Sequence, residues 1–285
     1  MRGGVLITGG GTGLGLEIAL TLAARGFTVH ASVPEEGQRP AVAAAAAQRG
    51  VTLQTPLLDV TDPANSEAVV RAIASSEGGL FAVVHNAGIS LRGYFEDCDD
   101  AEIRRVFEVN FFGTLAVTRA ALPVLRAAGR GRLVFITSIG GRIASLARTA
   151  YCASKFALEG FAESLMQEVT PLGLHVSIIE PAIIRTERWT VHRGVARRAL
   201  DPASPYRDWF AREEELADHL VRTSPTRPAD VGEAVYRALT APRPRLRYVV
   251  GRRAALVLAL RRYLPGELFE RIYFGEVMRR VTRPR

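Results

Sequence analysis

The sequence predicts an α/β fold, a single doubly wound domain with a parallel sheet of about seven strands flanked by helices. Three observations indicate it. Short apolar runs rich in β-branched residues alternate with longer stretches of helical character. Hydrophobic residues fill 48% of the 285 positions, enough for a substantial core. A glycine-rich turn follows the first apolar run and opens the first helical stretch.

The expected elements follow one another in regular order. Strands that are apolar throughout are buried on both faces, as in parallel sheets whose crossover helices cover both sides. The predicted strands are 4–8, 28–32, 52–57, 81–85, 132–137, 175–179 and 247–250. The predicted helices are 14–25, 40–49, 63–75, 101–128, 149–171 and 229–239.

Two stretches interrupt this alternation. Residues 186–228 hold two Trp, one Tyr and one Phe among many charges, in what reads as a long irregular insertion after the sixth strand. We expect them to form a lid over a ligand crevice at the carboxyl ends of the strands. Residues 252–285 are expected to be a basic helical C-terminal extension, so the main domain, with the lid inside it, spans 1–251.

The formal charge of +8 is concentrated at the C-terminus. Residues 252–285 hold nine Arg and three Glu, a net +6, and the remainder is close to neutral. No stripe of interleaved aromatic and basic residues is present, so we expect no nucleic-acid partner. The apolar run 254–260 lies between two Arg pairs and could rest on a membrane surface. A helix that covers the core or a substrate pocket is the favoured interpretation.

Cysteine usage and the N-terminus favour the cytoplasm. Cys98 and Cys152 are the only cysteines, too few for a disulfide framework, which favours a reducing compartment. No signal peptide is recognised, and no apolar run approaches the roughly 18 residues that span a bilayer. No group of His, Cys, Asp and Glu has the spacing of a metal site, so no metal is expected.

The glycine-rich turn has the spacing Gly9-x3-Gly13-x-Gly15. The common G-x-G-x-x-G fingerprint does not fit, because it would need a glycine at Ile18. The physical logic is unchanged: glycines permit positive φ and a close approach of backbone to a pyrophosphate, and the helix N-terminus supplies donors. After an apolar strand, this turn predicts a Rossmann-type, dinucleotide-binding domain.

The chain contains one lysine, Lys155, against 36 arginines. Arg replaces Lys at most surface positions, so the surviving Lys marks a site where a compact ammonium is required. Tyr151 lies four residues earlier, on the same face of a predicted helix. A nearby ammonium favours the phenolate of a tyrosine whose ordinary pKa is about 10. Ser138, just after a predicted strand, lies thirteen residues before Tyr151.

Together these motifs resemble the short-chain dehydrogenase/reductase family over about residues 4–190. The resemblance rests on the glycine turn, Asn86-Ala87-Gly88, Asn110, Ser138 and Tyr151-x3-Lys155, in the family's order and spacing. The phrases at 57–62, 151–156 and 176–181 are more specifically similar to the branch of retinol, hydroxysteroid and hydroxybutyrate dehydrogenases.

The resemblance implies a role for each of these residues. Tyr151 is the general acid or base, Ser138 orients the reacting oxygen, Lys155 also binds the nicotinamide ribose, and Asn110 supports a water relay behind Lys155. Pro181-Ala182 departs from the family's usual Pro-Gly. The implied cofactor-binding residues are Gly9, Thr12, Gly13, Leu14 and Gly15 at the pyrophosphate, Ser32, Asp59, Val60, Asn86, Ala87 and Gly88 around the adenosine, and Tyr151, Lys155, Pro181, Ile184 and Thr186 at the nicotinamide.

The sequence carries neither usual marker of cofactor choice. An acidic residue near position 32 would accept the ribose hydroxyls, and a basic one near 34 would favour a 2′-phosphate, but the chain has Ser32 and Pro34. Glu35 and Glu36 would repel a phosphate and Arg39 would attract one. The branch often uses NAD with similarly unmarked strands, so NAD(H) is favoured over NADP(H).

We therefore expect an NAD(P)-dependent oxidoreductase that interconverts an alcohol and a ketone or aldehyde on a fairly apolar small molecule. The rival from another class is a catalytically silent dinucleotide sensor or scaffold, which would be expected to lose Tyr151, Ser138 or Lys155. An epimerase of the extended relatives is disfavoured by chain length and glycine spacing. In the family, the helices that hold Asn110 and Tyr151 form subunit interfaces, which implies a homodimer or homotetramer.

Overall fold

A six-stranded, wholly parallel sheet forms the centre of the structure, a computed structural model that describes residues 3–76, 78–185 and 194–282. The strand order is β2-β1-β3-β4-β5-β6, and every neighbouring pair is parallel. The predicted α/β class is confirmed. The strands are β1 (Gly4–Ile7), β2 (Val29–Ala31), β3 (Leu80–His85), β4 (Gly131–Ile136), β5 (Leu174–Pro181) and β6 (Arg247–Val250).

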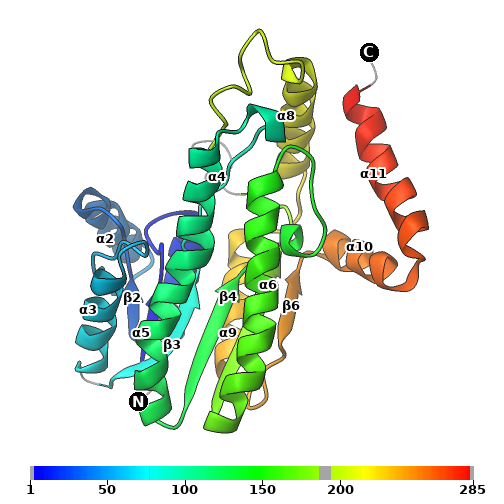
Figure 1. Ribbon diagram of the computed structural model, residues 1–285. Helices are drawn as coiled ribbons and strands as arrows, with labels where there is room; N and C mark the ends of the chain where they lie inside the picture. The colour runs from blue at the N-terminus through cyan, green and yellow to red at the C-terminus, as the bar shows by residue number, and fades with distance from the viewer. Residues whose placement is uncertain (1–2, 77, 186–193, 283–285) are drawn as a thin grey trace.

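Helices cover both faces of the sheet (Figure 1). Alternate side chains of one strand enter opposite cores: Val5 and Ile7 pack with α1 and α9, and Leu6 packs with α3, α5 and α6. The principal helices are α1 (Gly13–Ala24), α2 (Arg39–Gln48), α3 (Pro63–Ala74), α4 (Asp100–Phe107), α5 (Gly113–Ala127), α6 (Thr149–Val169), α8 (Arg207–Arg222), α9 (Pro228–Thr240), α10 (Arg252–Tyr263) and α11 (Gly266–Thr282).

The predicted strand 52–57 is not a strand of the sheet, although it runs parallel to the edge strand β2. Gln54 accepts from Ala31 N and donates to Val29 O, and Val33 bonds to Pro56 O and Leu58 N. The bond that would join these two pairs needs an N–H at Pro56, which proline lacks. Only isolated bridges remain, so the sheet has six strands where seven were predicted.

The predicted helix 101–128 is interrupted in its middle. A π-helical turn, η3 (Glu108–Phe112), separates α4 from α5 and carries Asn110. Such turns widen the helix locally and are frequent at functional sites. The sequence showed Asn110 as a poor helix former, but nothing in the pattern of apolar residues distinguishes a π-turn from a continuous helix.

The stretch 186–228 is more regular than the sequence predicted. Its residues 186–193, including Trp189, lie outside the described part of the chain, but α8 occupies sixteen of the others. Phe210 of α8 is buried in a small apolar cluster with Leu91, Val106 and Ala150, from the loop after β3 and from α4 and α6. This packing holds α8 beyond the carboxyl ends of the strands.

Two partly buried ion pairs fasten α8 to the loop after β3 and to the residue before α6. Glu214 pairs with Arg92, and Glu213 pairs with Arg148 at 3.2 Å. Burial raises the pKa of the Glu213 carboxyl to about 7, although the Arg148 charge opposes this and the Glu214 charge adds to it. Desolvation of this carboxylate therefore outweighs its attraction to Arg148.

The C-terminal extension is helical, as predicted. Helix α10 follows β6 directly, and α11 turns back to lie beside α8 (Figure 1). Within the described ranges, none of the helices combines the length and apolarity that crossing a bilayer requires.

Glu213 should make the protein less stable as pH rises from about 5 to 8. Its folded pKa of about 7 lies above the ordinary value of 4.5, so the folded state binds this proton more tightly than the unfolded state. The stability present below pH 4.5 is lost as pH passes through 7, by an amount on the order of 2 kcal/mol. Measured by urea unfolding, the free energy of unfolding of Glu213→Gln should decline less between pH 5 and 8 than that of the wild type. A decline of the same depth in both proteins, or an equal effect of the surface change Glu168→Gln, contradicts this.

Candidate active site

The glycine turn brings the chain from β1 into α1 with no space for side chains. Gly9 and Gly13 have φ of +62° and +54°, which favour glycine. A Cβ at Gly15 would lie 2.2 Å from the Gly9 carbonyl oxygen. Thr12 is the exposed N-cap of α1, and Leu14 packs partly against the core. An open backbone turn at a helix N-terminus suits a pyrophosphate, so these residues fit a dinucleotide.

A hydrogen-bonded clamp joins this turn to the end of β3. The Thr8 hydroxyl accepts from the backbone N–H groups of Asn86 and Ala87, both at 3.0 Å. The Asn86 amide donates to the carbonyls of Thr8 and Gly9 at 3.1 and 3.0 Å. The clamp lies where the strand order reverses between β1 and β3, the position at which doubly wound sheets bind ligands.

Three residues expected around the adenosine have their own partners in the protein. Ser32 is fully buried and donates to the Ile7 carbonyl at 3.2 Å. Asp59 is exposed and accepts from the hydroxyl and N–H of Thr61, which lower its pKa. Val60 is buried, and a Cβ at Gly113 would lie 2.7 Å from it. Only Asp59 presents an exposed polar group here.

At the other end of the crevice, β5 ends at Pro181, and Ile184 is buried in the core. Thr186 lies outside the described residues. The unusual Ala182 has a structural counterpart: Gly251 approaches it so closely that a Cβ there would lie 2.8 Å from the Ala182 methyl. The missing side chain at Gly251 makes room for the extra methyl that distinguishes this loop from the family pattern.

Lys155 and Tyr151 share one face of α6, as their spacing predicts. Lys155 is 5% exposed, and its ammonium donates to the Ile136 carbonyl at the end of β4 at 3.0 Å. The Lys155 Nζ lies 5.9 Å from the centre of the Tyr151 ring. Gly88 borders the same ammonium, since a Cβ there would lie 3.7 Å from Nζ. The structure therefore brings the ends of β3 and β4 together at Lys155.

Ser138 and Tyr151 lie on either side of Gly140. Ser138 caps the short 3-10 turn η4 (Ile139–Gly141), and its hydroxyl oxygen accepts from the Gly140 N–H at 3.0 Å. A Cβ at Gly140 would lie 3.3 Å from Ser138 Oγ and 3.5 Å from Tyr151 Cε1. Both side chains are half-buried, so they can face a ligand.

Asn110 is fully buried and binds two elements of the site at once. Its carbonyl oxygen accepts from Ile89 N at 2.7 Å, and its amide donates to Ile89 O and to Ser154 Oγ, both at 3.0 Å. Ser154 in turn donates to the Tyr151 carbonyl at 2.8 Å. Asn110 thus links the loop after β3 to the helix that carries Tyr151.

A buried charge cluster beneath Ser138 is absent from the sequence interpretation. The hydroxyl of Thr137 donates to Glu159 at 2.7 Å, and burial raises the pKa of this carboxyl. Arg247 lies 3.1 Å from Glu159 and 3.3 Å from the fully buried Glu180, which also pairs with Arg142 at 2.9 Å. The cluster ties β4, β5, β6 and α6 together directly below the site.

Two further residues escaped the sequence analysis. Ser154 binds Asn110, and its position within Tyr151-x-x-Ser154-Lys155, one helical turn after Tyr151, was the available signal. Gln38 lies over the glycine turn, since a Cβ at Gly11 would meet its amide oxygen at 2.9 Å. No local pattern distinguishes Gln38 from other polar residues at the start of a helix.

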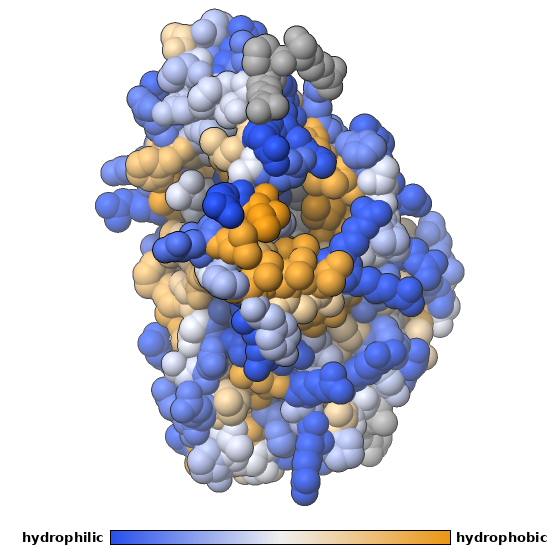
Figure 2. Space-filling model, turned by 90° about the vertical axis from the view of Figure 1, so that its right-hand side faces the viewer, coloured by the Kyte–Doolittle hydropathy of each residue, from blue (hydrophilic) through white to orange (hydrophobic). Residues whose placement is uncertain are grey.

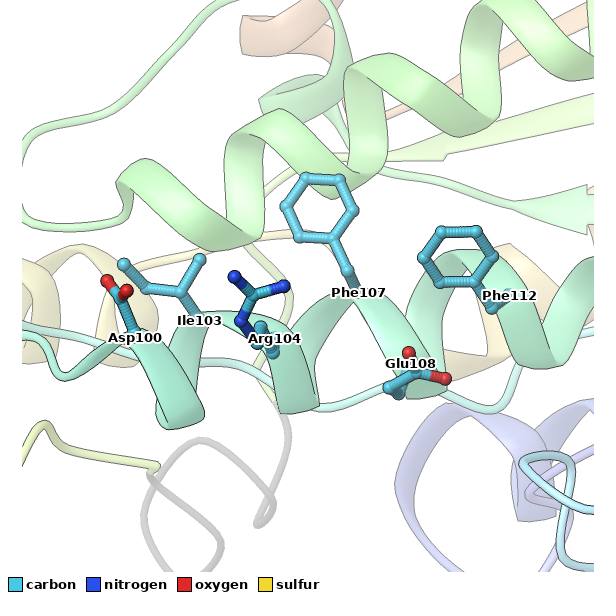
Figure 3. Close-up of a pocket in the computed structure, with 6 residues that line it drawn as sticks. All are labelled: Asp100, Ile103, Arg104, Phe107, Glu108 and Phe112. Atoms are coloured by element: carbon cyan, nitrogen blue, oxygen red, sulfur yellow. The ribbon is translucent and has the colours of Figure 1, made fainter.

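The hollow in Figure 3 is a different feature. It has a volume of about 370 Å³ and lies on the outer side of α4 and η3, with Ile103, Phe107 and Phe112 among the residues along it. None of the predicted catalytic or cofactor residues lines it. The candidate active site is instead the crevice bordered by the glycine turn, Asn86–Gly88, Ser138, Tyr151 and Lys155.

Comparison with known proteins agrees with this geometry. A family model described as short chain dehydrogenase matches residues 4–193. The chain is 35% identical over 284 residues to retinol dehydrogenase 5 of Mus musculus, covering 94% of this chain and 86% of that protein. It is 34% identical to 17-beta-hydroxysteroid dehydrogenase type 1 of Homo sapiens, covering 90% and 80% of the two chains.

A solved short-chain dehydrogenase from Streptomyces avermitilis has a similar fold. The TM-score is 0.77 at 31% identity, and the alignment covers 97% of this chain and 99% of the other. The chain therefore belongs to the short-chain dehydrogenase/reductase family and is an NAD(P)-dependent oxidoreductase that acts on alcohol and carbonyl groups.

Proposed function

We propose that Tyr151, Ser138 and Lys155 carry out the chemistry of this oxidoreductase, with Asn110 in a supporting role. The observation that carries the proposal is the placement of the buried Lys155 ammonium 5.9 Å from the Tyr151 ring, at the end of β4. A fixed positive charge there stabilises phenolate over phenol. Tyr151 can then release and recover a proton near neutral pH.

A nicotinamide cofactor bound in this crevice would supply or accept the hydride at the substrate carbon. In reduction, the Tyr151 hydroxyl gives its proton to the carbonyl oxygen; in oxidation, its phenolate takes the proton from the alcohol. Ser138 donates a hydrogen bond to the same oxygen and orients it beside Tyr151. Asn110 holds the loop after β3 against α6 through Ile89 and Ser154, and we retain a water relay behind Lys155 as its proposed function.

The cofactor would bind along the crevice between the glycine turn and β5. The tight turn at Gly9, Gly13 and Gly15 supports a pyrophosphate site, and Asp59 supports an adenine contact. The side chains of Ser32 and Asn86 hydrogen-bond to backbone carbonyls, so we assign them the support of this turn. Pro181, Ile184 and Thr186 remain our proposed flanks of the nicotinamide.

NAD(H) is our proposed cofactor rather than NADP(H). Arg39, the first arginine after β2, is held by Glu36 at 2.6 Å and by the Thr55 carbonyl at 2.9 Å. A 2′-phosphate would have to compete with Glu36 for that guanidinium and approach the neighbouring Glu35. These charges favour the cofactor that lacks the phosphate.

The proposed substrate is a fairly apolar small molecule. Three aromatic rings gather by the proposed lid: Tyr94 stacks on Tyr206 with centroids 4.7 Å apart, and Trp209 lies 6.1 Å from Tyr206. We propose residues 186–228 as the lid of a catalytic domain that spans 1–251, with 252–285 as an extension. The relatives named for retinol and hydroxysteroids are consistent with an apolar substrate.

Assembly and location also remain proposals. The hollow on α4 and η3, with Phe112 half exposed, and the exposed Phe156 of α6 support a homodimer or homotetramer through these helices. The mass of the protein by light scattering tests this state. Cys98 and Cys152 are free thiols, which supports a reducing compartment, the cytoplasm.

Tyr151→Phe should lower kcat by roughly 10²–10⁴-fold, because it removes the proton donor and leaves the ring in place. The change in reduced nicotinamide, consumed with ketones and formed with alcohols, measures it over a panel of both substrate types. The matched control Tyr236→Phe, on α9 against the opposite face of the sheet, should keep wild-type turnover. Near-normal turnover of Tyr151→Phe would overturn the mechanism, and inactivity of the wild type across the panel would favour the silent sensor.

NADH should bind more tightly than NADPH, by about tenfold, given the charges near Arg39. Fluorescence titration gives the two Kd values. Glu36→Gln removes the carboxylate that pairs with Arg39 and should reduce the difference between the two Kd values. Glu67→Gln breaks a similar Glu–Arg pair on α3 and should leave that difference unchanged. A clear preference of the wild type for NADPH is the contrary result.

A further inference from the structure

Helix α10 packs on the protein by one side and leaves an apolar side outward. Ala254 is buried, and Arg261 donates to the Arg142 carbonyl in the loop after Ser138. The outward side carries Leu256, Leu260 and Tyr263, which are 62%, 44% and 78% exposed. Their spacing of four and three residues places them on one face of the helix. The favoured sequence interpretation, a helix that covers the core, holds only for the Ala254 side.

Arginines flank this apolar face. Arg252 and Arg253 precede it and Arg262 lies between Leu260 and Tyr263 in the sequence, and all three are exposed. Among residues 3–76, 78–185 and 194–282, no carboxylate lies within ion-pairing distance of these three guanidinium groups. Figure 2 views the molecule from the side of α10 and α11 and shows an apolar area bordered by hydrophilic side chains.

Helix α11 also exposes apolar side chains beside arginines. Ile272 and Met278 are 57% and 42% exposed, and Arg271 is exposed next to Ile272. Glu276 neutralises part of the charge by pairing with Arg279 and Arg280 at 2.7 and 2.8 Å. The segment as a whole still carries nine Arg against three Glu.

We propose that α10 and α11 form a docking surface for an anionic lipid bilayer. Leu256, Leu260 and Tyr263 would enter the boundary between headgroups and acyl chains, and the flanking guanidinium groups would bind lipid phosphates. Long Arg stems lie along apolar surface while their heads reach the phosphates. The helix is too short to span the bilayer and lies in its surface.

Charge complementarity selects this occupant over a second copy of the chain. Two copies joined through this face would bring together two segments of net charge +6. An anionic bilayer offers the opposite charge, and each Arg near such a surface adds about 1 kcal/mol of attraction. The proposal goes beyond the oxidoreductase activity and does not depend on which substrate is used.

Vesicle flotation of the full chain tests the proposal. The protein should float with vesicles of phosphatidylcholine and phosphatidylglycerol, and much less with phosphatidylcholine alone, and high salt should weaken the binding. The double variant Leu256→Glu/Leu260→Glu should lower the bound fraction by roughly tenfold or more. Leu172→Glu, at a site 42% exposed on the turn between α6 and β5, is the matched control and should bind like wild type.

Circular dichroism and turnover report whether the double variant is folded. If it is not, Arg252→Gln/Arg253→Gln keeps the apolar face and should reduce both binding and its salt dependence. Equal flotation of wild type and these variants overturns the proposal. So does the absence of flotation at low salt, or a doubled mass by light scattering that Leu260→Glu abolishes, which would assign the face to a second copy.

Discussion

The hydrogen bond from the Lys155 ammonium to the Ile136 carbonyl is the interaction on which the site depends. It joins α6, which carries Tyr151, to the end of β4. Ser138 lies two residues beyond that end. Since the ammonium is buried, its charge acts through protein rather than water. A positive charge near a phenol stabilises its phenolate form, and it does so more strongly where water is excluded.

The surrounding contacts hold that arrangement from three directions. Asn86 and Thr8 fix the glycine turn against β3. Asn110, which lies in the π-turn, ties the same loop to Ser154 on α6. Glu159 binds Thr137 from below, within a cluster whose carboxylates are costly to bury unless paired. The proposed reacting groups thus lie on helices and strands whose relative positions are set by buried polar bonds.

Much of the fold and of the candidate site was predictable, because short patterns in the sequence determine it. Alternating strands and helices gave the sheet, and the i, i+4 spacing placed Tyr151 beside Lys155. The failures have physical reasons. Pro56 removes one bond from an otherwise regular ladder, and a π-turn at Asn110 leaves the apolar periodicity unchanged. Gln38 and the cluster of Glu159, Glu180 and Arg247 join residues distant in sequence, so only the folded chain reveals them.

Lys155→Arg tests the central claim most directly, because it keeps the charge and changes its shape. A planar guanidinium cannot occupy the narrow space between Gly88 and the Ile136 carbonyl with the same donors. We predict a loss of kcat of about 10²-fold or more with the circular dichroism of a folded protein, while Gln167→Arg on the exposed side of α6 keeps full activity. Turnover of Lys155→Arg within about threefold of wild type would contradict the account.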